Sequence, residues 1–271
     1  MKVRSLILGI LAGFLVAGVS AAGDDGPISV TTVYDNYSLH PDIELDLGPL
    51  GVGGFACVIQ TSHVDILFDT GPDGTALLSN MAVLSLDPAD IDLVVISHIH
   101  YDHIGGLPDF LETNPEVEVF VPNSSLRFIR ADRKTGVVGS IQLAENVYST
   151  GELRSVGMSP TGGKMPKEQS LVLTTGRGLV VVAGCSHPGI VEIVKKSKQM
   201  FPGEEVYLVM GGFHTKELSE PEICSILVEL RALGVLHLAP SHCSGDAFRV
   251  LSEREYGDGY IENGAGGVLH F

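Results

Sequence analysis

Short apolar runs rich in valine, isoleucine and leucine recur along the chain and alternate with amphipathic stretches. Runs of about four to eight such residues between turn residues predict buried strands, whereas apolar positions three and four apart predict helices. On this basis we expect strands over residues 28–34, 54–60, 64–68, 91–97, 117–121, 147–150, 171–174, 179–183, 206–210, 235–239 and 267–271. We expect helices over residues 73–84, 107–112, 124–131, 190–200, 220–233 and 247–255.

The order of these elements predicts an α/β domain with two sheets and helices on the outside. Neighbouring strands come first in the chain and helices are interleaved with strands later, which suits such layers. The chain has 271 residues, of which 44% are hydrophobic, and this is enough for one large core. It contains no internal repeat and no linker rich in Pro, Gly or Ser, so we expect one domain over residues 23–271.

The first 22 residues have the pattern of a secretory signal peptide. Lys2 and Arg4 precede an uninterrupted run of apolar and small residues over 6–19, and small residues follow at 20–22. This order of charged, apolar and small residues is typical of a cleaved leader. We therefore expect residues 1–22 to be removed and the protein to be exported, either to a periplasm or to the exterior. An uncleaved membrane anchor is the alternative, because the apolar run approaches the length of about 17 residues that spans a bilayer.

The charge of the chain bears on its partners. Without Lys2 and Arg4, the chain has 15 basic and 33 acidic residues, a net charge of −18. A surface this acidic argues against nucleic acid and against anionic membranes, because both attract basic patches. We expect a small-molecule substrate, and the sequence leaves the oligomeric state open. The segment 127–138, with four basic side chains, is either a contact for an anionic substrate or a solvated face.

A dense cluster of metal-ligand side chains follows the apolar run over 91–96. Four such residues lie within six positions: His98, His100, Asp102 and His103. Imidazole and carboxylate groups bind Zn²⁺, Mn²⁺ and Fe²⁺, and a loop at the end of a strand is where such sites are usually found. This density predicts a metal site rather than a His-rich surface loop.

Further potential ligands follow other expected strands. Each comes shortly after an apolar run: Asp69, Cys185, His187, His214 and His242. If these strand ends meet at one edge of the sheets, segments far apart in the sequence converge there, as a dinuclear metal site requires. The remaining histidines are isolated, and we assign them no function: His40, His63, His237 and His270.

These motifs resemble those of the metallo-β-lactamase superfamily. The resemblance rests on the His-x-His-x-Asp-His motif and on further motifs at 36–38, 68–71, 184–190, 211–214 and 241–245. Within the superfamily, the chain is similar to the branch of 7,8-dihydropterin-6-methyl-4-(β-D-ribofuranosyl)-aminobenzene-5'-phosphate synthase-like proteins. The resemblance implies an αββα sandwich of two mixed β-sheets with helices on the outer faces. It also implies a centre with two divalent metal ions, zinc in the first place, with Mn²⁺ or Fe²⁺ as alternatives.

The resemblance implies roles for individual residues. The ligands would be His98 and His100 for one metal ion, and Asp102, His103 and His242 for the other. Asp69 matches the buried aspartate that orients the metal loop in relatives. Its alternative is a turn-forming residue before Gly71. We expect Asp69 and Asp102 to act in catalysis.

The chain departs from the usual pattern of the superfamily at two places. No histidine occurs over 158–169, where most relatives have one, and Cys185 stands where a bridging aspartate is usual. We expect His187 to supply the missing imidazole, and a histidine placed before Pro188 by turn chemistry is the alternative. Cys185 is either a thiolate ligand of the second metal or a small buried residue.

The roles of His214 and of the other cysteines are less determined. His214 follows two glycines, and it is either a general acid, a contact for a substrate phosphate, a metal ligand or a packed core histidine. We expect Cys243 to pack against neighbouring side chains. Cys57 and Cys224 are expected to be buried apolar residues, with a bridge between them left open.

Metal-assisted hydrolysis is the function that these features predict. Water bound by two divalent ions has a pKa of about 7, and the resulting hydroxide attacks an ester, lactone, thioester or phosphodiester. One alternative is a transferase like the synthase that names the branch, although its cytosolic substrate disagrees with an export signal. Others are a non-catalytic protein that binds metal or ligand, and oxidoreductase chemistry on two irons.

Overall fold

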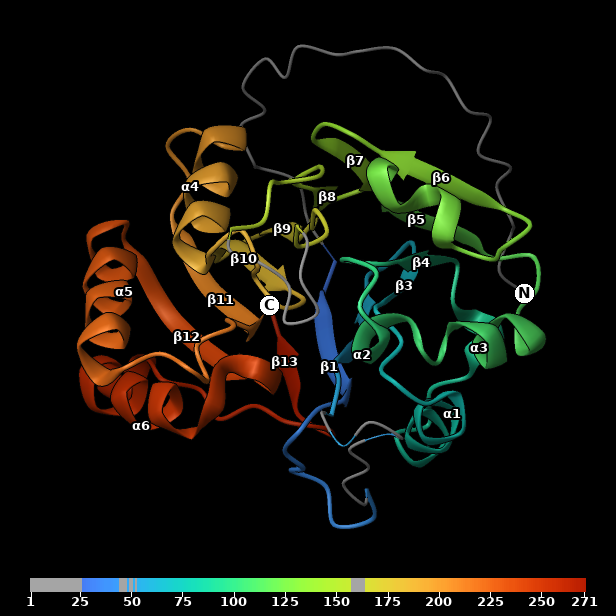
Figure 1. Cartoon of the computed structure of the whole chain (residues 1–271), viewed down its shortest axis with the longest axis horizontal. Coiled ribbons are helices and arrows are strands. Elements are labelled where there is room, and N and C mark those ends of the chain that lie inside the picture. The colour runs from blue at the N-terminus through green and yellow to red at the C-terminus, as the bar shows by residue number, and fades with distance from the viewer. Residues whose placement is uncertain (1–25, 44–47, 49–50, 52, 157–163) are drawn as a thin grey trace.

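The computed structural model describes residues 26–43, 48, 51, 53–156 and 164–271. The expected signal peptide, residues 1–22, lies outside these residues. Two β-sheets form the centre of the described chain, with helices on their outer faces (Figure 1). No helix in this described part is both long and apolar enough to cross a membrane.

The first sheet contains seven strands, and six of them come from the first half of the chain. They are β1 (Ser29–Tyr34), β2 (Ala56–Gln60), β3 (Asp65–Phe68), β4 (Leu93–Val95), β5 (Glu118–Pro122), β6 (Lys134–Val137) and β13 (Val268–His270). Their order across the sheet is β13-β1-β2-β3-β4-β5-β6. Pairs from β13 to β3 are antiparallel, whereas pairs from β3 to β6 are parallel. The carboxyl ends of β3 and β4 therefore lie at the same edge.

The second sheet contains six strands and is also mixed. They are β7 (Ile141–Ala144), β8 (Val147–Ser149), β9 (Leu171–Thr175), β10 (Gly178–Ala183), β11 (Val206–Gly212) and β12 (Val235–Ser241). Their order is β12-β11-β10-β9-β8-β7. Strands β10, β11 and β12 are parallel to one another, so their carboxyl ends share one edge.

Helices cover the outer face of each sheet (Figure 1). They are α1 (Gly74–Val83), α2 (Tyr101–Ile104), α3 (Leu107–Thr113), α4 (Ile190–Met200), α5 (Glu220–Ala232) and α6 (Gly245–Tyr256). Helices α1 and α3 pack in one cluster with the first sheet, and α4, α5 and α6 in another with the second. This arrangement gives the four layers α, β, β, α.

The apolar core has three layers, as the expected sandwich requires. Phe68 and Val95 of the first sheet pack in one cluster with Val182 of the second. Leu77 of α1 belongs to the cluster outside the first sheet, and Leu227 of α5 to the cluster outside the second. These layers confirm the αββα sandwich of two mixed β-sheets.

All four cysteines are free thiols. Cys57 lies in the layer between the sheets, whereas Cys224 is on α5 and packs at the outer layer. The bridge between them that the sequence left open is therefore absent from this structure.

The segment between β5 and β8 differs most from the sequence expectations. Strands β6 and β7 were not expected, because their sequences lack an apolar run; half of their residues are exposed. The helix expected over 124–131 is a short 3-10 helix, Asn123–Phe128. Ile129 N donates to Leu126 O (3.4 Å), so the apolar residues three apart fit a 3-10 turn rather than an α-helix.

Candidate metal centre

Segments from both sheets converge where their strands end. Strands β3 and β4 end shortly before Asp69 and His98, and β10 ends shortly before Cys185. Strands β11 and β12 lead into His214 and His242. Because the strands within each set are parallel, their following residues gather at one edge of each sheet.

His98, His100 and His187 form a first cluster, which we call the three-histidine group. One ring nitrogen of each lies within 4.8 Å of the other two. His98 is fully buried, and its Nε2 has no hydrogen-bond partner. Burial and the neighbouring imidazoles hold the pKa of His98 well below its usual range, so the ring is neutral. Because an unpaired buried nitrogen needs a partner and a neutral imidazole is a metal ligand, this group fits a divalent ion.

Hydrogen bonds orient two of the three rings of this group, those of His98 and His187. Nδ1 of His98 lies 2.9 Å from Oγ of Ser97. That hydroxyl donates to Oδ2 of Asp69 (2.6 Å), so its oxygen accepts from His98 Nδ1–H and leaves the lone pair of Nε2 free. Nδ1 of His187 lies 2.9 Å from Oε2 of Glu168. Such contacts fix the tautomer of an imidazole and aim its other nitrogen at a metal.

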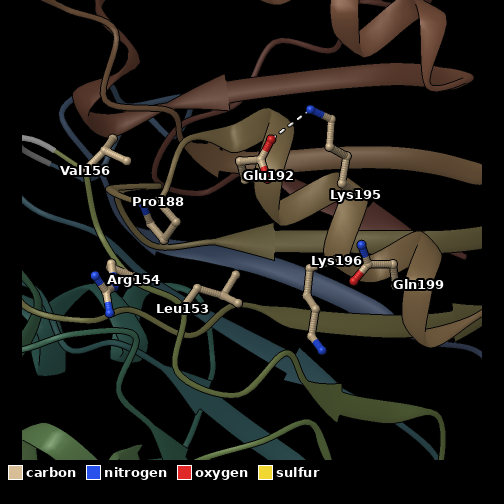
Figure 2. Close-up of a pocket in the computed structure, with 8 residues that line it drawn as sticks. All are labelled: Leu153, Arg154, Val156, Pro188, Glu192, Lys195, Lys196 and Gln199. Carbon is tan, nitrogen blue, oxygen red and sulfur yellow. Dashed lines mark hydrogen bonds and ion pairs between the residues drawn. The ribbon is translucent and has the colours of Figure 1, made fainter.

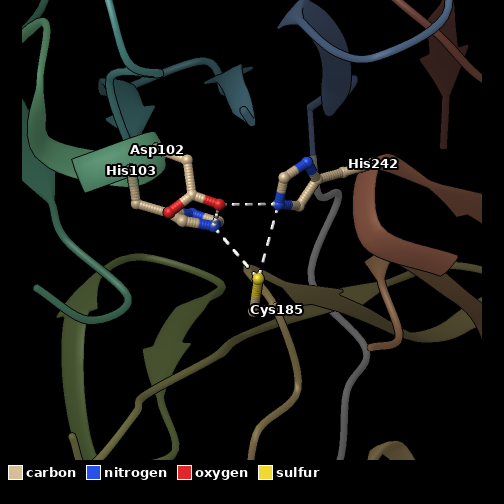
Figure 3. A group of neighbouring side chains, drawn as sticks. All are labelled: Asp102, His103, Cys185 and His242. Carbon is tan, nitrogen blue, oxygen red and sulfur yellow. Dashed lines mark hydrogen bonds and ion pairs between the residues drawn. The ribbon is translucent and has the colours of Figure 1, made fainter. Parts of the chain in front are cut away.

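Figure 3 shows a second cluster, which we call the mixed group: Asp102, His103, Cys185 and His242. Sγ of Cys185 lies 3.2 Å from Nε2 of His103 and 3.4 Å from Nε2 of His242. Oδ2 of Asp102 lies 3.4 Å from Nε2 of His242 and 3.7 Å from Nε2 of His103. A carboxylate, two imidazoles and a thiol therefore face one another, and this donor set suits zinc. Cys185 is buried, and its sulfur is one of the four potential ligand atoms of this group.

The carboxylates of Asp69 and Asp102 control the charge of the mixed group. Burial lowers the pKa of His103, but the carboxylates of Asp69 and Asp102 raise it to about 9. Oδ2 of Asp69 lies 2.7 Å from Nδ1 of His103. Although burial raises the pKa of Asp102, His103 and His242 hold it well below its usual range. At neutral pH without a metal ion His103 is thus protonated, and a metal ion bound at its Nε2 would displace a proton.

The backbone around the two groups adopts a rarely populated conformation. Four of the six non-glycine residues with positive φ in the described chain lie here: Asp69 (60°), Ser186 (63°), His214 (53°) and His242 (50°). Each such residue costs on the order of 1–3 kcal/mol, and such strain is concentrated at functional sites. The surrounding packing therefore holds these side chains in positions that a relaxed loop would not select.

Glycines let the strand ends approach one another. A Cβ on Gly184 would lie 2.2 Å from Oγ of Ser97. A Cβ on Gly212 would lie 2.3 Å from the backbone oxygen of Gly184 and 2.8 Å from Sγ of Cys243. All three distances are far shorter than a carbon atom tolerates, so the chain segments pack closely at Gly184 and Gly212.

Sequence reasoning missed Glu168, which supports the three-histidine group. Its side chain is buried, and its two oxygens accept from the backbone N–H groups of Cys185, Ser186 and His187 at 2.8–2.9 Å. Burial raises the pKa of Glu168, but His187 and these amides lower it further, to about 2. Glu168 therefore stays ionised and fixes the loop that carries both Cys185 and His187.

We expect Glu168→Gln to weaken metal binding at the three-histidine group about 10–100-fold, the usual effect of losing a partner that orients a ligand. Glutamine retains the shape of the side chain, but it loses the charge and presents an amide to an imidazole. Competition with a coloured chelator measures the affinity. Glu253→Gln, an exposed change on α6, is the matched control and should leave the affinity unaltered. Equal affinities in both variants would contradict the assignment.

Two other contacts were not foreseen. Oδ1 of Asn36 lies 3.0 Å from Nδ1 of His242, which gives a role to a motif that the sequence left without one. Sγ of Cys243 lies 3.4 Å from Sγ of Cys185, although Cys243 was expected only to pack. The one signal for Cys243 is its place beside His242 in the sequence.

The structure thus brings the six expected metal ligands into two adjacent groups. Asp69 lies outside both and contacts Ser97 and His103, the position that the resemblance implied for it. His214 is exposed at the rim, and its ring centroid lies 4.5 Å from that of His187. It forms a third cluster of potential ligands with Cys185 and Cys243.

The sequence profile of the metallo-beta-lactamase superfamily matches residues 50–216. The chain belongs to this superfamily. It is 29% identical over 247 residues to the 7,8-dihydropterin-6-methyl-4-(beta-D-ribofuranosyl)-aminobenzene-5'-phosphate synthase of Methanocaldococcus jannaschii, covering 76% of this chain and 84% of that protein. These similarities confirm the resemblance that the motifs indicated, for both the superfamily and the branch.

Solved structures agree with this membership. Tm1679, described as a metal-dependent hydrolase of the beta-lactamase superfamily, matches with a TM-score of 0.75 and 26% identity over 89% of this chain and 98% of its own. The metallo-beta-lactamase fold protein YhfI from Bacillus subtilis matches with a TM-score of 0.62 and 15% identity, over 91% of this chain and 100% of its own. The second likeness shows the shared fold alone.

Proposed function

We propose that the chain is a metal-dependent hydrolase of small-molecule substrates. The observation that carries the proposal is the adjacency of the two ligand groups: the ring centroids of His98 and His103 are 4.2 Å apart. Two divalent ions bound there would supply hydroxide from a shared water and would polarise the bond to be cleaved. The nitrogen and sulfur donors favour zinc, with Mn²⁺ or Fe²⁺ as alternatives.

Within the mixed group, Asp102 is the ligand most open to an incoming substrate. Its side chain is 20% exposed, whereas that of His103 is fully buried. Because its pKa is held low, it is ionised at neutral pH and can bind metal without first losing a proton. Asp69 acts through His103 and Ser97, so it is a positioning residue that touches no substrate.

A surface hollow of about 470 Å³, lined in part by Pro188, supports an anionic substrate (Figure 2). Three cationic side chains line it: Arg154, Lys195 and Lys196. Lys195 is paired with Glu192 (2.8 Å), whereas Arg154 and Lys196 have no ion pair with another described residue. In so acidic a chain, two unpaired cations in one hollow favour a ligand with a phosphate or carboxylate.

Residues that line the hollow are connected through the backbone to His187 of the three-histidine group. Pro188, which lines it, directly follows His187, and Val156 N donates to the backbone oxygen of His187 (3.0 Å). By contrast, three of the four basic side chains in segment 127–138 have other partners. Arg133 pairs with Glu118 (3.4 Å), the guanidinium of Arg127 lies over the ring of Phe128, and Lys134 donates to the backbone oxygen of Ile129. We therefore place the anion contact at the hollow and not at that segment.

A second candidate function is a synthase reaction like that of the Methanocaldococcus jannaschii relative. The similarity to that protein and the cationic hollow support it, since the product in its name carries a phosphate. The hydrolase proposal is supported instead by the similarity to Tm1679, which is described as a hydrolase. Binding of metal or ligand without catalysis is the third candidate function.

Hydrolysis by metal-loaded protein tests the proposal. We expect the zinc-loaded protein to cleave at least one of a small set of lactones, thioesters and phosphodiesters. A chelator should remove the activity, and added Zn²⁺ or Mn²⁺ should restore it. Within the set, compounds with a free phosphate or carboxylate should have lower KM than neutral analogues. Metal-loaded protein that cleaves none of them but joins a dihydropterin to an aminobenzene ribosyl phosphate would establish the synthase instead.

Export and partners remain proposals from the sequence. We propose that the protein is exported after removal of residues 1–22, and that it acts on small molecules and not on nucleic acid or membranes. The charge of the chain without its leader supports the second statement.

A further inference from the structure

Beyond the two metal groups, the structure holds a second thiol beside the centre. Sγ of Cys243 lies 3.4 Å from Sγ of Cys185. With a ring nitrogen of His214, these sulfurs form a third set of ligand atoms that all lie within 4.8 Å of one another. We propose that Cys185, Cys243 and His214 bind a third, thiophilic metal ion, with Cys185 bridging it to the mixed group.

The separation of the two sulfurs fits a shared ion. Two thiolates bound to one zinc ion at about 2.3 Å in a tetrahedron are about 3.8 Å apart, close to the 3.4 Å between Cys185 and Cys243. A disulfide has an S–S bond of about 2.05 Å, so these two sulfurs are not bonded. Two sulfurs and one nitrogen form a donor set that selects zinc and other thiophilic ions over magnesium or calcium.

Local backbone geometry builds this cluster. Gly212 has no Cβ, and a Cβ there would lie 2.8 Å from Sγ of Cys243, so only glycine leaves room for the thiol. His214 has φ of 53°, and its backbone N–H donates to Sγ of Cys243 (3.3 Å). This strained turn places the His214 ring at the rim, beside the ring of His187. A packed core histidine needs none of these features.

The proposed third site differs from the other two in its access to solvent. Cys185 is buried and Cys243 is partly buried, whereas His214 is exposed. Three protein ligands leave a fourth position of a tetrahedral ion open, and the exposed side of the site can take a water molecule or a substrate anion. This assignment gives His214 a role as ligand in place of general acid. The third site rests on the proposed dinuclear centre, with which it shares Cys185 as a ligand.

Metal titration of matched variants tests the third site. Reduced, metal-free protein is titrated with Co²⁺, whose thiolate bonds absorb, and a parallel sample saturated with Zn²⁺ is measured for zinc content by elemental analysis. We expect about three equivalents in the unchanged protein, and about two in both Cys243→Ser and His214→Gln. The thiolate–cobalt absorption should fall in Cys243→Ser without vanishing, because Cys185 remains. Cys224→Ser on α5 is the control and should retain about three equivalents.

The outcomes separate this inference from the proposed function. About two equivalents in the unchanged protein, with equal cobalt spectra in Cys243→Ser, would overturn the third site and show that the thiols only hydrogen-bond. The dinuclear centre and its hydrolysis would survive that result. His214→Gln lies at an exposed position, so its result stands even if Cys243→Ser folds poorly. Fewer than two equivalents in the unchanged protein would overturn both proposals.

Discussion

Replacing Asp102 by Asn is expected to lower kcat/KM for hydrolysis about 1000-fold, equivalent to about 4 kcal/mol of transition-state stabilisation. The change keeps the shape of the side chain but removes the only carboxylate of the mixed group. Its Oδ2 contacts both His103 and His242, so the substitution also removes the charge that holds these imidazoles. Steady-state kinetics at saturating zinc measures the effect.

The control for this change is Asp109→Asn. Asp109 is an exposed aspartate in the first turn of α3, close in the sequence to Asp102 but outside both groups. It removes the same charge and should leave kcat/KM within about twofold, since exposed charges are screened by solvent. Equal losses in the two variants would show that the effect of Asp102 is general electrostatics and not ligation.

Replacing His98 by Ala is expected to remove one bound metal ion and the stabilisation that this ion gives. At free zinc 100 times the dissociation constant, one site stabilises the fold by about 2.7 kcal/mol. Without metal, the substitution leaves a cavity but removes an unpaired buried nitrogen, so two opposing effects act on the apo protein. The informative quantity is therefore the difference in unfolding free energy with and without zinc.

His237→Ala is the matched control for this second prediction. His237 on β12 also has a buried ring nitrogen, Nδ1, without a hydrogen-bond partner, but it belongs to neither ligand group. Its substitution should leave the zinc-dependent stabilisation unchanged. If His98→Ala and His237→Ala keep the same zinc-dependent difference as the unchanged protein, the three-histidine group does not bind the metal.

The potential metal ligands that lie within short sequence motifs could be predicted from the sequence. Four of the potential ligands are close in the chain: His98, His100, Asp102 and His103. The end of the preceding apolar strand predicts that a loop begins at this point. His187 was placed by the absence of a histidine elsewhere and by the strand that precedes it. The layers of the fold followed in the same way, because buried strands and amphipathic helices carry strong periodic patterns.

Contacts between distant parts of the chain could not be read in this way. Glu168 accepts from Cys185, Ser186 and His187, yet its own neighbours give no sign of burial or of a metal site. Asn36 contacts the ring of His242 although the two residues are 206 positions apart in the sequence. The edge strands β6 and β7 were missed because exposed edge strands need no apolar alternation, and only their pairing partners define them.

The central claim is that two adjacent ligand groups each hold a metal ion. Anomalous diffraction at the zinc absorption edge, from crystals grown with zinc, tests it most directly. We expect one peak between the rings of His98, His100 and His187, and another between Asp102, His103, Cys185 and His242. A zinc-saturated crystal with no anomalous peak at either group, or with peaks only at other places, would contradict it.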